Sequence, residues 1–487
     1  MGSAIMEKQE GWVVSHLRGL LKNTFIYGVG DVLGKFIGFI LIPIYTKYLT
    51  PSEYGTFNLC LLFSGFISIF CLLGINSAFF RFFIGSEDKE KQRHLFSTTF
   101  WSISLLSLLV VIVCLIFSKS LSLLVLKSSY DSNLIKIASF NVLIEAILTI
   151  FLLIFRAEGR SFVYVSTMLT KLGSGLIFNC FFVIYLRSGP VGIFWSNILS
   201  SIVALIIVLP KTKFYLRCYF STRLLKNLLK YGLPLIPTSI AMIIISLSDR
   251  YFIQIFCGIK EVGIYSLGYK FGMAIGLLVT AFNFAWSPTI FWIAREENAR
   301  KIFSDILTYY TSGVTFFFLG LALFLNELFR LFVNLSFQEA SGIVLFIGLS
   351  YIFYGFYLNF QVGLYLKDKT GWVALLCITA AILNITLNFL LIPKYGIEGA
   401  AVATLFSYIV LALMGFWFSQ GCYKISYQFG KVLKIALIAG GIFYFSSRFL
   451  GPKLSFDLLA FKILMLTAYT LSLFIFRIIP APILRKA

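Results

Sequence analysis

The sequence predicts an all-α polytopic membrane protein with about fourteen transmembrane helices. Of its 487 residues, 59% are hydrophobic and 13% are charged, and apolar runs of about twenty residues recur from one end to the other. The longest polar stretches, residues 85–94 and 211–230, are far shorter than the roughly 50 residues that an independent soluble domain needs. We therefore expect the whole function to be carried out within the membrane.

Each predicted helix is an apolar run that is long enough to cross the hydrocarbon core. In chain order, the runs cover residues 23–48, 55–83, 95–118, 134–156, 162–186, 191–209, 231–257, 263–293, 302–325, 342–366, 372–392, 397–420, 432–447 and 458–476. Charged residues, glycine or proline separate the runs, which is typical of the ends of membrane helices. The separating segments are 49–54, 84–94, 119–133, 157–161, 187–190, 210–230, 258–262, 294–301, 326–341, 367–371, 393–396, 421–431 and 448–457.

The basic residues are concentrated in alternate connecting segments, and the segment 210–230 is the richest in lysine and arginine. By the positive-inside rule, this pattern predicts that both termini lie in the cytoplasm. The formal charge of +21 is thereby explained by membrane topology and does not indicate a nucleic-acid partner. The eight cysteines show no metal-ligand spacing, so we expect no metal site.

Two short motifs recur and indicate that a six-helix unit has been duplicated. The sequence Glu-x-Gly-x-aromatic-small-Leu begins at Glu53 and again at Glu261, and a Gly-x-x-Gly pair begins at Gly189 and again at Gly396. Because the unit has an even number of helices, its two copies are parallel. We predict an N-lobe of residues 1–215, a C-lobe of residues 216–421 and two additional helices in residues 422–487, arranged around a central cavity.

Four basic residues, Lys35, Lys171, Arg250 and Lys270, fall inside predicted membrane helices. A charge at the bilayer centre costs roughly 2.5–3.5 kcal/mol on insertion scales, so such side chains face the interior of the bundle. The duplication does not repeat them, since the corresponding positions hold Ile243, Ile378, Ile42 and Leu62. We therefore predict that the four cations line one cavity and bind an anionic head group.

Three acidic residues, Asp31, Glu145 and Asp249, also lie within the predicted helices. Asp31 stands four residues before Lys35 on the same helical face, and Asp249 is next to Arg250 and within reach of Lys270. Two interpretations remain open for each acid: charge pairing with a cation, or coupling of transport to an ion or a proton. Lys171 has no acid in its own helix, which favours the ligand-binding interpretation for this residue.

Several motifs resemble one known family. They are Asn23-Thr-Phe-Ile-Tyr-Gly-Val-Gly30, the segment Tyr48–Phe57, Asp249–Ile253 with Gly258 and Glu261–Ser266, and Phe284-Ala-Trp-Ser-Pro288. With these motifs the chain resembles the polysaccharide repeat-unit (O-antigen, Wzx-type) flippases of the multidrug/oligosaccharidyl-lipid/polysaccharide exporter superfamily. The resemblance implies a bacterial inner-membrane transporter, without catalytic residues, that moves undecaprenyl-diphosphate-linked oligosaccharide to the outer leaflet by alternating access.

The resemblance also implies partners and a role for the last two helices. The partners are the polyprenyl-diphosphate-linked glycan, membrane lipids and a downstream polysaccharide polymerase. In the related lipid II flippases a further helix pair forms a groove for the lipid tail, and we extend this role to residues 432–476. No nucleotide-binding motif is present, so we expect no cofactor and propose a Na⁺ or H⁺ gradient, or consumption of the product, as the driving force.

Two rival functions are open at this stage. A multidrug or metabolite antiporter of the same superfamily would favour acidic cavity residues over basic ones. A membrane glycosyltransferase or polymerase would need a catalytic acidic motif in a sizeable loop, whereas the predicted outer loops are short and poor in carboxylates.

Overall fold

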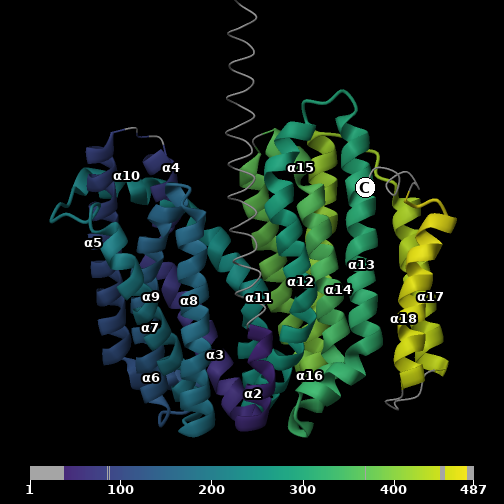
Figure 1. Cartoon of the computed structure of the whole chain (residues 1–487), viewed down its shortest axis with the longest axis horizontal. Helices are drawn as coiled ribbons and strands as arrows, with labels where there is room; N and C mark the ends of the chain where they lie inside the picture. The colour runs from purple at the N-terminus through teal and green to yellow at the C-terminus, as the bar shows by residue number, and fades with distance from the viewer. Residues whose placement is uncertain (1–37, 85, 87, 368, 450–455, 480–487) are drawn as a thin grey trace, which may run out of the picture. The chain divides into compact units, whose positions relative to one another are not determined.

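The computed structural model describes residues 38–84, 86, 88–367, 369–449 and 456–479. Every regular element in these ranges is a helix (Figure 1). In chain order the helices are α2 (Ile42–Tyr48), α3 (Pro51–Leu72), α4 (Ile75–Ile84), α5 (Lys89–Ile116), α6 (Ser118–Leu126), α7 (Ser132–Ala157), α8 (Ser161–Asn179), the π-helix η1 (Cys180–Tyr185), α9 (Gly189–Thr212), α10 (Thr222–Gly232), the 3-10 helix η2 (Leu233–Leu235), α11 (Ile236–Phe256), α12 (Ile259–Ile293), α13 (Ala299–Phe332), the 3-10 helix η3 (Leu335–Ala340), α14 (Ser341–Phe360), α15 (Val362–Leu366), α16 (Thr370–Cys422), α17 (Phe429–Phe449) and α18 (Phe456–Ile475).

The predicted all-α membrane fold is confirmed. Within the described residues, 12 helical segments are long and apolar enough to cross a membrane. One of them, α16, contains two helices joined at Gly396, whose φ of 56° and ψ of −135° are not helical. Most of the first predicted helix, residues 23–48, lies outside the described residues, and α2 forms its last part. The count is therefore consistent with the prediction of about fourteen.

The second predicted helix, residues 55–83, is broken in the structure. Leu73 and Gly74 have φ values of 43° and 69°, which end α3 and start α4 in a new direction. A Cβ atom at Gly74 would collide with the carbonyl group of Gly232, at the end of the amphipathic helix α10. The break therefore lets α4 pack against α10, which buries Leu228 and leaves Lys226 exposed.

The segment between α9 and α10 is fastened to the rest of the first unit by side-chain hydrogen bonds. Ser97 of α5 donates to the carbonyl oxygen of Tyr215 at 3.0 Å and accepts from the backbone N–H of Arg217 at 2.9 Å. The hydroxyl of Tyr215 donates to the carboxylate of Glu158. Burial and this hydrogen bond raise the pKa of Tyr215 to about 12, so the hydroxyl remains a donor at neutral pH.

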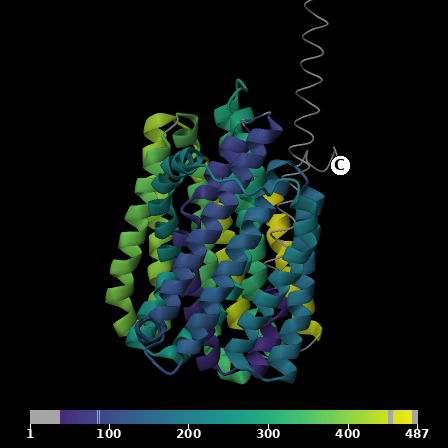
Figure 2. The ribbon, with the colours of Figure 1, turned by 90° about the vertical axis from the view of Figure 1, so that its left-hand side faces the viewer.

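The contacts divide the chain into two units, one ending at Tyr251 and the other starting at Phe252. In the first unit, α7 packs against α3, α5 and α9, and α8 packs against α9 (Figures 1 and 2). In the second unit, α14 packs against α12 and α16, and α17 and α18 pack against α13 (Figure 1). The lobe boundaries predicted at residues 215/216 and 421/422 stay predictions.

The duplicated motifs share one backbone feature in the two units, a glycine with a positive φ. Gly189 and Gly396, the pseudo-equivalent glycines, both have a φ of 56°, a conformation that side chains other than glycine seldom adopt. In the first unit, Glu53 completes a capping box at Thr50 and lies directly beside Gly189. In the second unit, Glu261 and Gly396 line the same pocket. The duplicated glutamate and glycine are thus in contact in the first unit, whereas in the second they line one pocket without such a close contact.

Close approach of α12 and α14 depends on three glycines spaced four residues apart. A Cβ atom at Gly268 would collide with the carbonyl oxygen of Ala340, and one at Gly272 would lie 2.6 Å from Cβ of Ile347. Gly276 faces Tyr351 in the same way. Small residues at this spacing let membrane helices pack closely where lipid offers no hydrophobic driving force.

Candidate functional site

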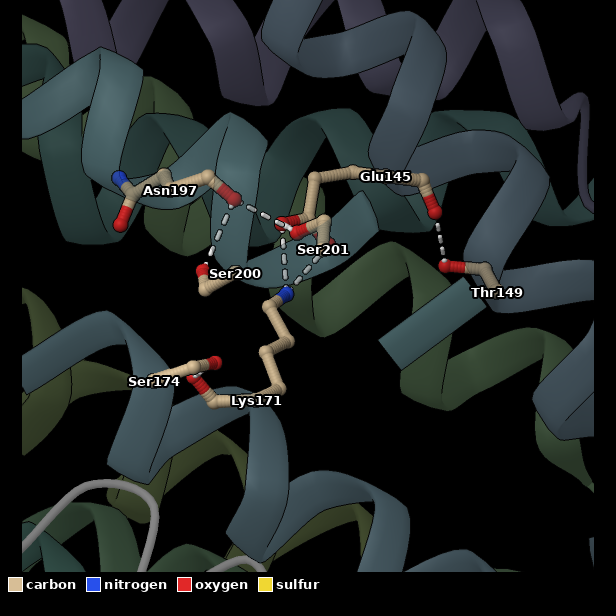
Figure 3. Close-up of polar contacts among 7 residues, drawn as sticks. All are labelled: Glu145, Thr149, Lys171, Ser174, Asn197, Ser200 and Ser201. Carbon is tan, nitrogen blue, oxygen red and sulfur yellow. Dashed lines mark hydrogen bonds and ion pairs between the residues drawn. The ribbon is translucent and has the colours of Figure 1, made fainter. Parts of the chain in front are cut away.

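Lys171 lies in α8 and forms an ion pair with Glu145 of α7. Its Nζ is 2.6 Å from Oε1 and 2.7 Å from Oε2 of Glu145. Ser201 of α9 donates a hydrogen bond of 2.7 Å to the same Oε1, so three helices meet at this carboxylate (Figure 3). The side chains of Lys171 and Glu145 are 21% and 35% exposed. These contacts therefore hold the pair in place, and both side chains remain partly exposed.

The helices around this ion pair carry small polar residues that satisfy their hydroxyl groups locally. Thr149 donates to the carbonyl oxygen of Glu145 at 2.7 Å, and Ser174 donates to that of Lys171 at 3.1 Å (Figure 3). Ser200 donates to the carbonyl oxygen of Asn197 at 2.9 Å. Such bonds within a helix satisfy hydroxyl groups inside a membrane span, and they place several polar groups around the ion pair.

Arg250 and Asp249 form a second ion pair within α11. Nη1 of Arg250 lies 2.9 Å from Oδ1 of Asp249 and donates to the carbonyl oxygen of Ser246 at 2.8 Å. The arginine side chain is 5% exposed and the aspartate side chain is fully buried. The predicted pairing of Asp249 with Lys270 would join residues of different units, and it stays a prediction.

The other predicted site residues are distributed as follows. Lys270 lies half-buried in α12 of the second unit, next to Tyr269, whose hydroxyl is 3.3 Å from that of Tyr351. Lys35 and Asp31 lie outside the described residues. The structure thus brings Lys171 together with Glu145, and Arg250 together with Asp249. That all four cations line one cavity stays a prediction.

A family model described as polysaccharide biosynthesis protein matches residues 20–294, more than half of the chain. The chain belongs to this family. One curated relative, the probable low-salt glycan biosynthesis flippase Agl15 of Haloferax volcanii, is 24% identical over 233 residues, which are 46% of this chain and 48% of that protein. The chain spans about half the length of this relative. The family resemblance drawn from the sequence motifs is confirmed.

Solved structures of two kinds of transporter share the fold of this polysaccharide biosynthesis protein. A structure titled lipid II flippase MurJ, inward closed conformation, has a TM-score of 0.74 at 18% identity and covers 92% of this chain and 98% of that one. An inward-facing multidrug resistance MATE family transporter of the MOP superfamily has a TM-score of 0.63 at 17% identity and covers 80% of this chain and 94% of that one. The chain is therefore a multi-pass membrane protein with this fold.

This polysaccharide biosynthesis protein has a third ion pair, more deeply buried than that of Lys171, which was not predicted from the sequence. Lys462 of α18 lies 2.6 Å from Oε1 of Glu327, near the end of α13, and the two side chains are only 6% and 10% exposed. Lys462 falls within the last predicted membrane run, residues 458–476, so the criterion that selected Lys171 also applies to it. Its position only a few residues from the start of that run gives a weaker sequence signal than a charge at mid-span.

Two buried amides were also missed. Asn384 and Asn388 lie on one face of α16, both fully buried, and Nδ2 of Asn388 donates to Oδ1 of Asn384 at 3.0 Å. A pair of asparagines four residues apart in an apolar run is a visible signal, because polar groups in membrane helices face protein and not lipid. Within the described ranges, no group of three or more His, Cys, Asp or Glu residues could hold a metal ion.

Proposed function

We propose that this protein is a flippase that moves a polyprenyl-diphosphate-linked oligosaccharide from the cytoplasmic to the outer leaflet by alternating access. Membership of the polysaccharide biosynthesis family supports the glycan. The likeness to a lipid II flippase supports the lipid carrier and the transport cycle. The name of the relative Agl15 supports a flippase in glycan synthesis. Undecaprenyl diphosphate and an O-antigen-like or capsule-like glycan are the proposed cargo.

The ion pair of Lys171 and Glu145 carries this proposal most directly. An ammonium held between helices and still 21% exposed can exchange its carboxylate for an incoming phosphate. Glu145 keeps its bond from Ser201 during such an exchange, or takes up a proton, so that no uncompensated charge is left buried. In the cycle we propose, Lys171 and Lys35 bind the diphosphate from the cytoplasmic side, and Arg250 and Lys270 release it outward.

The carboxylates supply a coupling step in the same scheme. If Glu145, Asp249 or Asp31 takes up H⁺ or Na⁺, its basic partner becomes available to the anionic head group. A gradient of either ion would then reset the empty carrier. Glu145 and Asp249 already neutralise Lys171 and Arg250. The carboxylate and the cargo therefore compete for the same basic side chain, and an ion or proton that binds the carboxylate favours the cargo.

An apolar pocket in the second unit offers a place for the polyprenyl chain. It has a volume of about 590 Å³ and lies among α13, α14 and α17. Its lining includes Phe318, Leu349, Phe353, Leu433 and Phe443. In this scheme the head group crosses among polar residues while the chain stays against this apolar wall. The role proposed for residues 432–476 is thereby attached to specific side chains.

The cellular setting is part of the proposal. We propose a bacterial cytoplasmic membrane with both termini in the cytoplasm, following the positive-inside rule. A polysaccharide polymerase at the outer face is the proposed consumer of the product.

Transport by protein reconstituted in vesicles tests this function. We expect wild-type protein to translocate a fluorescent polyprenyl-diphosphate oligosaccharide, and Lys171→Ala and Arg250→Ala to reduce the rate by about tenfold or more, since each removes a cation from a site of low dielectric. Lys434→Ala, an exposed lysine of α17, is the matched control and should transport at the wild-type rate. Unchanged rates in both site variants would show that these cations form structural ion pairs and do not bind the cargo.

A multidrug or metabolite antiporter is the second candidate, favoured by the likeness to MATE transporters and by the presence of Glu145 and Asp249 beside the cations. A cationic substrate would bind the carboxylates, and an anionic one the basic groups. Transport of a cationic dye that is lost in Glu145→Gln but kept in Lys171→Ala would favour the antiporter. The opposite selectivity, with lipid-linked cargo, would favour the flippase.

A further inference from the structure

Polar contacts attach the C-terminal helix pair to α13 at two levels near the ends of α13, and between them the hydroxyl of Tyr469 in α18 donates to the carbonyl oxygen of Ser312 at 3.0 Å. At the first level, Nε2 of Gln428, just before α17, donates to Oδ1 of Asp305 at 2.7 Å. At the second, Lys462 of α18 is paired with Glu327. Asp305 lies near the start of α13, and Glu327 lies six turns further on, near its end. One contact therefore fastens the start of α17, and the other fastens α18 to the far end of α13.

The second of these contacts is the more deeply buried. The side chains of Lys462 and Glu327 are 6% and 10% exposed, and the lysine also lies 5.7 Å from the ring of Phe324. Within the described residues, Oε2 of Glu327 is buried and makes no hydrogen bond. Removal of either partner would thus leave a charge in an apolar setting with nothing to replace it.

The apolar pocket lies between these two levels. The residues of α13 that line it all fall between Asp305 and Glu327, and they are Thr311, Thr315, Phe318, Leu319 and Ala322. The opposite walls are α14 and α17, and α18 supplies none of the pocket's lining residues. Because α18 packs against both α13 and α17 (Figure 1), its attachment fixes where α17 stands.

Apolar packing by itself does not fix this position. The interface of α13 with α17 and α18 is a cluster of aliphatic and aromatic side chains that includes Leu323, Ile435 and Leu473. Lipid tails are as apolar as these residues, so such packing gives little preference for one position over another. A buried ion pair does, because its geometry is met at a single register.

We propose that Glu327 and Lys462 are positioning residues that hold α17 at a fixed distance from α14 and so set the width of the apolar pocket. The occupant, a long isoprenoid chain, rests on the proposed function. The control of the pocket width by the ion pair does not depend on the proposed function. Loss of either charge leaves α18 attached to α13 only by apolar packing and the bond from Tyr469 to Ser312. The far end of the helix pair can then shift, α17 moves away from α14 there, and the preference of the pocket for a long chain is lost.

The test measures pocket width and chain selectivity separately on the full-length protein in lipid nanodiscs or vesicles. Spin labels on cysteines at Leu345 of α14 and Leu433 of α17, both pocket residues, report the width when the native cysteines are replaced. The variants are Glu327→Gln, Lys462→Met, the neutral double variant and the charge exchange E327K/K462E. Lys434→Met, on the exposed side of α17, is the matched control.

We expect a longer and broader label distance in both single variants and in the neutral double variant, and the wild-type distance in the control and in the charge exchange. The ratio of transport of a long-chain polyprenyl lipid to that of a three-isoprene analogue should fall by roughly tenfold in the single variants. A purely structural role would lower both transport rates alike. A wild-type distance in the single and neutral variants would overturn the inference.

The two proposals fail in different ways. If wild-type protein transports neither lipid, the proposed function is contradicted, and the label distances still decide whether the ion pair sets the pocket width. If the charge exchange does not fold, the neutral double variant remains informative, because it leaves no unpaired charge behind and is expected to fold with a widened pocket.

Discussion

At the scale of single residues, three of the described intramembrane cations, Lys171, Arg250 and Lys462, pair with carboxylates at very different sequence separations. Arg250 pairs with the residue before it, Asp249, whereas Lys171 pairs with Glu145 on another helix, 26 residues away. Hydropathy shows that such a charge must face protein, but not which neighbouring helix supplies its counter-ion. The sequence therefore singled out Lys171 and Glu145 but not Ser201, and packing of α7, α8 and α9 decided their partnership.

We predict that Lys171 and Glu145 are coupled energetically. Glu145→Gln and Lys171→Met should each lower the thermal stability of the purified protein, because each leaves an opposite charge partly buried without its partner. The double variant should be more stable than the sum of the single effects implies, by about 1–2 kcal/mol. Melting curves of the four proteins in one detergent give this coupling directly, and additive effects would contradict the pairing.

At the scale of helices, helix ends that are marked by charged residues or proline were predicted from the sequence. Breaks without such residues were missed. The break within α16 was predicted, because Pro393, Lys394 and Gly396 interrupt the apolar run. The break between α3 and α4 was missed, because a single Gly74 in an apolar run does not show that the helix must turn there. Its cause is the close contact with Gly232, which is far away in the sequence.

We predict that Gly268→Ala destabilises the second unit. The added methyl group would meet the carbonyl oxygen of Ala340, and such overpacking costs about 1–3 kcal/mol because the backbone has to move. Gly313→Ala in α13 is the matched control, since none of the described atoms lies within 4 Å of its Cβ position. Thermal unfolding should show a lower melting temperature for Gly268→Ala alone. Equal melting temperatures of the two variants would contradict a stabilising role of the close contact at Gly268.

At the scale of the whole molecule, duplication and charge asymmetry were the most informative properties of the sequence. The shared φ of Gly189 and Gly396 supports the duplication. The arrangement of cations from both units around one cavity depends on how the units are placed, and the motifs of each unit carry no information about that placement. The fold was therefore predictable to a greater extent than the site.

We predict the orientation of the chain from two exposed native cysteines. Cys218 lies in the basic segment between α9 and α10, and Cys257 directly follows α11. With both termini in the cytoplasm, a membrane-impermeant maleimide added to intact cells or spheroplasts should label a variant that retains only Cys257 and should not label one that retains only Cys218. Permeabilised cells, in which both should react, are the control. The reverse pattern would invert the topology.

The pair of Glu327 and Lys462 also bears on how the protein is made. The two residues are 135 positions apart, and Lys462 lies in the last helix of the described chain. During synthesis, the carboxylate of Glu327 therefore enters the bilayer long before its lysine exists, at a time when an unpaired charge there is costly. Neutralisation of this carboxylate therefore has to wait until α18 has been synthesised and inserted.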